Sequence, residues 1–68
     1  MAETLDCRLK AARTARGWTQ ADLAEQVGVS RKTINTVENG VFIPSTALAL
    51  KLARALDTSV EALFALTD

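Results

Sequence analysis

The segment VSRKTINTVENG, residues 29–40, holds a dense set of side chains that can form directed hydrogen bonds. Arg31 and Lys32 can each reach O6 and N7 of a guanine, and arginine does so with two bonds from a rigid fork. Thr36 can offer its hydroxyl to a base or its methyl group to thymine. The other uncharged polar residues of the segment are Ser30, Thr33, Asn35 and Asn39. These residue types suit contact with the bases and phosphates of a nucleic acid.

The helix predicted for this segment would begin with two cations, Arg31 and Lys32. Positive charge opposes the helix dipole in a first turn, where acids are normally preferred, so these cations indicate a polyanionic partner. The alternative is an ordinary solvated helix start. Asn35 could reach an adenine, but the inward-facing Ile34 beside it would turn it sideways, so we expect it to contribute less than Thr36.

Shorter polar residues and helix N-termini suit phosphates better than bases. Ser30 and Thr33 have short side chains, and Thr19 is foremost a helix cap. The helix N-termini at Gln20 and Ser30 present free backbone N–H groups, which attract phosphate. Arg16 could equally contact a phosphate or remain solvated.

Composition limits the other functions that this sequence could have. The 68 residues contain eight basic and eight acidic side chains, no histidine and one cysteine. The common zinc sites and an intrachain disulfide are therefore excluded. No paired carboxylates or glycine-rich loop converge on a site, so we expect neither an enzyme nor a cofactor, metal or small-molecule ligand. No apolar run approaches the roughly 18 residues of a membrane span, so we expect a cytoplasmic protein.

Apolar periodicity and turn residues divide the chain into five short helices, and no strand is predicted. Leu5, Leu9 and Ala12 give the first helix an apolar stripe. The second helix follows the capping box Thr19 to Asp22, and the third follows the N-cap Ser30. Only three residues, Gly28, Val29 and Ser30, separate the second helical pattern from the third. A turn this short is typical of the helix-turn-helix.

The second half of the chain is predicted to supply the fourth and fifth helices, over about residues 45–66. Ser45 or Thr46 would cap the fourth helix, with Leu48 and Leu52 facing inward. The capping box TSVE, which begins at Thr58, would open the fifth. The sequence VEALFAL that follows is apolar nearly all round, and a helix of this kind needs cover on both sides.

From GWTQADLAEQVGVSRKTINTVENG through PSTALALKLARALDTSVEALF, the chain resembles the lambda-repressor-like, Xre/Cro-type helix-turn-helix family. The resemblance covers residues 5–66. It implies an all-α, compact five-helix DNA-binding domain over residues 1–68, with the helix-turn-helix at about 19–39 and no room for a ligand-sensing domain. It also implies that the third helix, Ser30 to Asn39, enters the major groove of double-stranded DNA.

The resemblance further implies roles for single residues. The positions that match base-reading sites are Arg31, Lys32 and Thr36. The positions that match phosphate contacts are Gln20 and Asn39. Arg13 and Glu38 match an ion pair between the first and third helices, and the remaining donors of Arg13 could also contact a phosphate. Val41 stands where the family usually has a lysine or arginine, so that phosphate contact is missing here.

Two apolar stretches, VFI after Gly40 and the fifth helix, are difficult to bury within one small monomer. We therefore predict a homodimer whose interface includes Phe42, Ile43, Ala62 and Leu66. A two-fold contact would set two recognition helices one DNA turn apart, roughly 34 Å, to read a palindromic site. The alternative is a single core with a frayed C-terminus.

The predicted function is that of a transcriptional regulator, a repressor that occupies a palindromic operator and associates with the nucleoid when bound to DNA. Zero net charge does not exclude this function, because the cations lie mainly in the first 40 residues. The alternative is an antitoxin or a restriction-modification controller that regulates its own promoter. A long tail would favour an antitoxin, and this sequence ends at Asp68. A third helix without long donors would favour a protein-interaction module.

Overall fold

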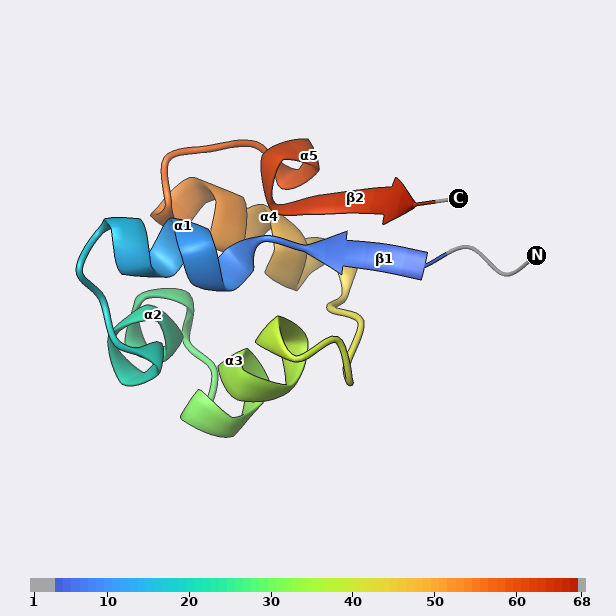
Figure 1. Cartoon of the computed structure of the whole chain (residues 1–68). Helices are drawn as coiled ribbons and strands as arrows, with labels where there is room; N and C mark the ends of the chain where they lie inside the picture. Colours follow the sequence, from blue (N-terminus) through green and yellow to red (C-terminus); the bar gives the residue numbers. More distant parts are fainter. Residues whose placement is uncertain (1–3, 68) are drawn as a thin grey trace.

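The computed structural model describes residues 4–67, so residues 1–3 and Asp68 lie outside the described part. Five helices form the body, and two short strands from opposite ends of the chain lie side by side next to it (Figure 1). The elements in chain order are β1 (Thr4–Cys7), α1 (Leu9–Ala15), α2 (Gln20–Val27), α3 (Arg31–Glu38), α4 (Thr46–Ala55), α5 (Val60–Leu63) and β2 (Phe64–Thr67). Within residues 4–67, no helix is long and apolar enough to cross a membrane.

Side-chain caps start most of the helices where the sequence predicts. Oγ1 of Thr19 accepts a hydrogen bond from the N–H of Asp22 at 3.0 Å, and the N–H of Thr19 donates to the Asp22 carboxylate at 2.9 Å, which completes the predicted capping box. Hydroxyl caps also start α3 and α4, at Ser30 and Ser45. At α5 the prediction is wrong by one residue. The cap is Ser59 rather than Thr58, because Ser59 has the extended backbone that an N-cap needs and accepts from the N–H of Ala62.

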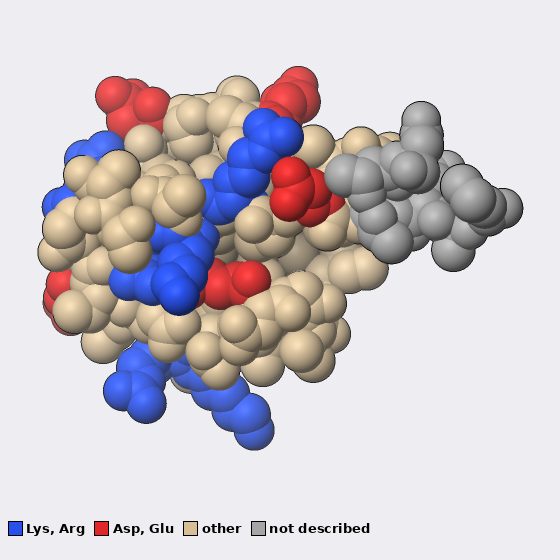
Figure 2. All heavy atoms as spheres, in the orientation of Figure 1, with Lys and Arg blue, Asp and Glu red and all other residues tan. Residues whose placement is uncertain are grey.

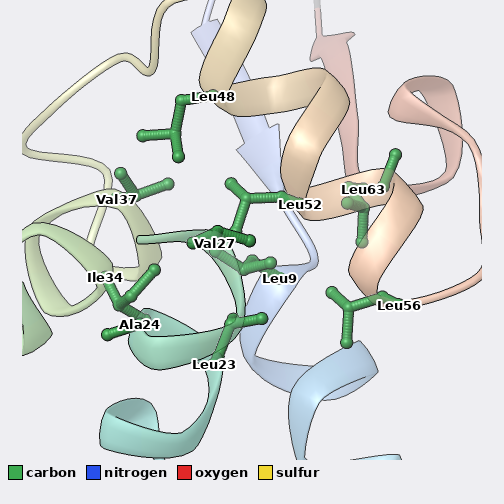
Figure 3. Packing of buried hydrophobic residues seen from close by; sticks show 11 residues of the cluster. Leu9, Leu23, Ala24, Val27, Ile34, Val37, Leu48, Leu52, Leu56 and Leu63 are labelled. Atoms are coloured by element: carbon green, nitrogen blue, oxygen red, sulfur yellow. The ribbon is translucent and has the colours of Figure 1, made fainter. Parts of the chain in front are cut away.

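Every helix contributes a large, fully buried side chain to one core (Figure 3). These side chains, which are at most 1% exposed, are Leu9, Leu23, Ile34, Leu52 and Leu63. Burying a leucine of this kind stabilises the fold by about 1.5–3 kcal/mol. The inward residues predicted for the third and fourth helices, Ile34, Leu48 and Leu52, are confirmed, and α2 packs against both α3 and α4.

The prediction of five helices is confirmed, but the prediction of no strand is wrong at both ends of the described chain. Leu5 lies in β1, and α1 begins only at Leu9. Helix α5 ends at Leu63, and the segment predicted to continue it forms β2, which pairs antiparallel with β1. The pairing connects the two ends of the chain, whereas helix periodicity considers only near neighbours in the sequence. The N–H of Arg8 also donates to the carbonyl of Leu63 at 2.8 Å, which continues the bonding into the helical body.

The two-stranded ribbon has one apolar face. Leu5 lies opposite Leu66, and Cys7 lies opposite Phe64. Because side chains alternate along a strand, these four residues point to the same side of the ribbon. Phe64 and Cys7 pack against the core, whereas Leu66 is 68% exposed. Burial raises the pKa of the Cys7 thiol, so this cysteine stays a neutral, apolar packing residue.

Candidate nucleic-acid interface

Helices α2 and α3 form a helix-turn-helix, as the sequence predicts. Gly28 ends α2 in the left-handed conformation, with φ of 74°, which glycine adopts without steric cost. Ser30 then caps α3 only two residues later. Ile34 and Val37 bury the inner side of α3. The exposed polar residues on and just after α3 are Arg31, Lys32, Asn35 and Asn39.

Two exposed cations lie at the start of α3, although the net charge of the chain is zero. Lysine and arginine side chains project from the lower edge in Figure 2, where α2 and α3 lie in Figure 1. Arg31 and Lys32 are both exposed in the first turn of α3. The only acid of α3, Glu38, has a side chain that is 2% exposed and is paired with Arg13. The acid therefore does little to offset the two cations at the surface.

Arg13 and Glu38 form a buried ion pair that joins α1 to α3. Nε of Arg13 donates to Oε2 of Glu38 at 2.6 Å, and Nη2 donates to Oε1 at 3.2 Å. Nη1 of Arg13 donates to the carbonyl of Trp18 at 2.7 Å. The two side chains are 9% and 2% exposed. Hydrogen bonding to Glu38 raises the pKa of Arg13, so the guanidinium stays charged, and the pairing implied by the family resemblance is confirmed.

Three side-chain amides continue this ion pair toward the surface. Nε2 of Gln20 donates to Oε1 of Glu38 and to Oδ1 of Asn35, at 3.1 Å each. Nδ2 of Asn39 donates to the same Oδ1 of Asn35 at 3.3 Å. Both amide hydrogens of Gln20 are thus engaged within the protein. A phosphate contact near Gln20 would rely on backbone N–H groups unless this amide rearranges.

An open hollow of about 470 Å³ lies between the start of α2 and the start of α3. Its lining residues are Arg13, Gly17, Trp18, Thr19, Gln20, Ala21 and Arg31. The guanidinium of Arg16 lies over the Trp18 ring, 4.8 Å from its centroid. The backbone N–H groups of Gln20 and Ala21 lie in the first turn of α2, where the helix itself provides no acceptor for them. The hollow therefore combines a helix N-terminus with arginine side chains, which is a suitable place for a phosphate.

The hydroxyl groups of α3 are engaged locally. Oγ of Ser30 and Oγ1 of Thr33 lie 3.0 Å apart, and Ser30 also caps the N–H of Thr33. Oγ1 of Thr36 donates to the carbonyl of Thr33 at 2.9 Å, so toward a base Thr36 can offer its methyl group or accept a hydrogen bond, but it has no donor left. A second hollow, of about 350 Å³, lies beside Thr36 and is lined by Lys32, Thr33, Thr36, Val41 and Phe42.

A third, apolar hollow of about 460 Å³ lies between the ribbon and α4. Its lining includes Leu5, Ile43, Leu50 and Phe64. Of the predicted interface residues, Ile43 lines this hollow, Phe42 precedes it in the chain, and Leu66 pairs with Leu5, whereas Ala62 is exposed outside the lining. The hollow is also lined by Leu5 and Leu50, which sequence reasoning did not place at this surface. Leu50 could have been found, because it lies between the inward Leu48 and Leu52 and must face elsewhere on a helix.

Known proteins are similar to this chain over most of its length. The helix-turn-helix family matches residues 9–63. An uncharacterized helix-turn-helix transcriptional regulator from Archaeoglobus fulgidus is 43% identical over 90% of this chain and 87% of its own. The restriction-modification controller protein C.AhdI from Aeromonas hydrophila superposes with a TM-score of 0.76 and 41% identity, over 79% of this chain and 82% of that one. SinR, a master regulator for biofilm formation solved in complex with DNA, superposes with a TM-score of 0.74 and 31% identity, over 79% and 87%.

Proposed function

Since this chain belongs to the Xre/Cro-like helix-turn-helix family of transcriptional regulators, we propose that it is a repressor that binds a palindromic DNA operator as a homodimer. The observation that carries this proposal is the exposed first turn of α3. Arg31 and Lys32 lie there with the acid of the same helix buried and paired. Repression then follows from occupancy, because a protein bound to the operator blocks the access of RNA polymerase to the promoter.

The base contacts of this proposal come from Arg31, Lys32, Thr36 and Asn35 in the major groove. Phosphate contacts come from both ends of the α2–α3 unit. Those near the hollow at the start of α2 are Thr19, the backbone N–H of Gln20, Arg13 and Arg16, and those along α3 are Ser30, Thr33 and Asn39. The SinR structure, which contains DNA and is 31% identical, supports DNA as the partner.

Selection of bound sequences from random duplex DNA at low salt tests the proposal directly. We expect one enriched site whose two halves are related by two-fold symmetry, with centres about one DNA turn apart. A pool that remains random after several rounds, with protein that is folded by circular dichroism, would contradict sequence-specific binding.

Replacing Arg16 with alanine is expected to weaken binding to all sequences about equally. Arg16 is held over Trp18, which lines the hollow at the start of α2, so its role is electrostatic and carries no base preference. The slope of log K against log salt concentration should fall in magnitude by about 0.9 for each phosphate that the variant no longer neutralises. Arg54→Ala, which removes an exposed arginine from the end of α4, is the matched control. If the two variants give the same salt-dependence slope, Arg16 does not contact a phosphate.

The homodimer is supported by apolar surface that one chain leaves uncovered. The exposed large apolar residues of the described chain are Leu5, Val41, Phe42, Ile43, Leu50 and Leu66. Three of them, Leu5, Ile43 and Leu50, line the apolar hollow beside the ribbon. Apolar surface of this extent is common at protein–protein interfaces. A second copy of the chain is the occupant that a palindromic site requires.

Replacing Leu66 with glutamate is expected to convert the dimer into a monomer, because the new charge would be buried against apolar groups of the partner. Sedimentation equilibrium should give the mass of two chains for the wild type and of one chain for the variant. Gln26→Glu adds the same charge at an exposed position of α2 and should leave the dimer intact. A monomeric wild type at micromolar concentrations would refute the interface.

A restriction-modification controller is the second candidate, and the similarity to C.AhdI favours it. A controller of this kind would bind DNA upstream of its own gene. Binding assays with that promoter and with the site found by random selection would separate the candidates. A repressor of other genes should prefer the selected site, whereas a controller should bind its own promoter equally well.

A further inference from the structure

We propose that the buried Arg13–Glu38 ion pair, acting through Gln20, fixes Asn35 as a hydrogen-bond donor to DNA. Asn35 would then prefer a base edge that carries acceptors and disfavour cytosine. Of these four residues only Asn35 touches a base, so Arg13, Glu38 and Gln20 are positioning residues for base recognition. The inference rests on the proposed function, because it assumes that the exposed face of α3 reads the major groove.

The first step is the orientation of the Gln20 amide. A carboxylate can only accept hydrogen bonds, so the Gln20 atom that lies 3.1 Å from Oε1 of Glu38 must be the nitrogen. Rotating the amide by half a turn would set its carbonyl oxygen against that buried carboxylate. Glu38 cannot turn away, because Arg13 holds both of its oxygens.

The second step is the orientation of the Asn35 amide. The other hydrogen on Nε2 of Gln20 points to Oδ1 of Asn35 at 3.1 Å, and Nδ2 of Asn39 donates to the same oxygen. Both lone pairs of Oδ1 are therefore occupied by the protein. The exposed Asn35 has its amide N–H groups left for a partner.

The third step is what such a donor can recognise. An asparagine that binds adenine with two bonds must offer both its oxygen and its nitrogen, and here the oxygen is engaged. In the major groove, guanine offers two acceptors, thymine offers O4 and adenine offers N7, whereas cytosine offers only the donor N4. Asn35 should therefore exclude cytosine and prefer guanine at the base pair that it faces.

Two variants test this assignment by selection from random duplex DNA. Asn35→Asp has nearly the same shape and keeps an oxygen for Gln20 and Asn39, but it turns an acceptor toward the DNA. We expect the preference at one base pair per half-site to shift toward cytosine by roughly tenfold. Gln20→Ala removes the link to the ion pair, so the Asn35 amide can take either orientation. The preference at that same base pair should then relax, while all other positions of the site stay unchanged.

If the side chain of Gln20 instead contacts a phosphate, Gln20→Ala should weaken binding to all sites uniformly and retain every base preference. That result, or an Asn35→Asp variant with the wild-type preference at every position, would overturn the amide assignment and leave the proposed function standing. A wild-type protein that enriches no site would overturn both.

Discussion

Replacing Glu38 with alanine is expected to lower the free energy of unfolding by about 3–5 kcal/mol, because it leaves an uncompensated charge inside the protein. The Arg13 side chain is only 9% exposed, and Glu38 accepts two of its hydrogen bonds. Gln20 would lose an acceptor at the same time. Urea denaturation followed by the fluorescence of Trp18, the only tryptophan, measures the change. A chain of this size is marginally stable, so the variant should be largely unfolded at room temperature.

Removing both charges provides the control for this prediction. Arg13→Met combined with Glu38→Leu should cost much less than the two single changes added together, because no unpaired charge remains. Glu25→Ala, at an exposed position of α2, should change the stability by no more than about 0.5 kcal/mol. If Glu38→Ala is as stable as Glu25→Ala, the ion pair does not hold α1 against α3.

Replacing Arg31 with alanine is expected to remove the preference for one base pair per half-site, at a cost of about 1–3 kcal/mol per contact. Arg31 is exposed in the first turn of α3, where a two-bond contact with guanine is within reach of its guanidinium. Affinity for the selected site and for single-base variants of that site would be measured by fluorescence anisotropy. The wild type should discriminate at the affected pair and the variant should not.

Two comparisons sharpen the Arg31 experiment. Arg31→Lys keeps the charge but loses the planar fork, so it should recover affinity better than it recovers base preference. Arg54→Ala removes an equal charge from α4 and should leave the preference unchanged. If Arg31→Ala weakens every site by the same factor, Arg31 contacts phosphate and a different residue reads that base.

Much of this protein could be predicted because its signals are local. A cap is a bond between residues three positions apart, so Thr19 with Asp22, and Ser30, could be identified from the sequence. The buried side of α3 follows from the spacing of Ile34 and Val37. The family resemblance added the Arg13–Glu38 pair, which joins distant residues and has no local signal.

The errors lie where distant segments meet. Periodicity predicts both Leu5 and Leu66 in helices, but the two lie opposite each other in a ribbon. Each segment is short and apolar, and such segments cannot be assigned to helix or strand by periodicity alone. The partner strand decides the conformation, because its backbone groups provide the hydrogen bonds that each segment would otherwise have to form within a helix.

By itself, the amino-acid sequence determined the helix-turn-helix and the residue types that α3 turns outward, because caps, glycine turns and apolar spacing act over a few residues. The tertiary structure alone decided which donor and acceptor atoms of these side chains remain free for a partner. The hydroxyl of Thr36 is bonded within its own helix, whereas the amide of Asn35 is oriented by Gln20 on α2, which in turn is oriented by Glu38. The direction of a side-chain amide depends on partners that only the packing of helices brings within about 3 Å, and a linear sequence does not specify that proximity.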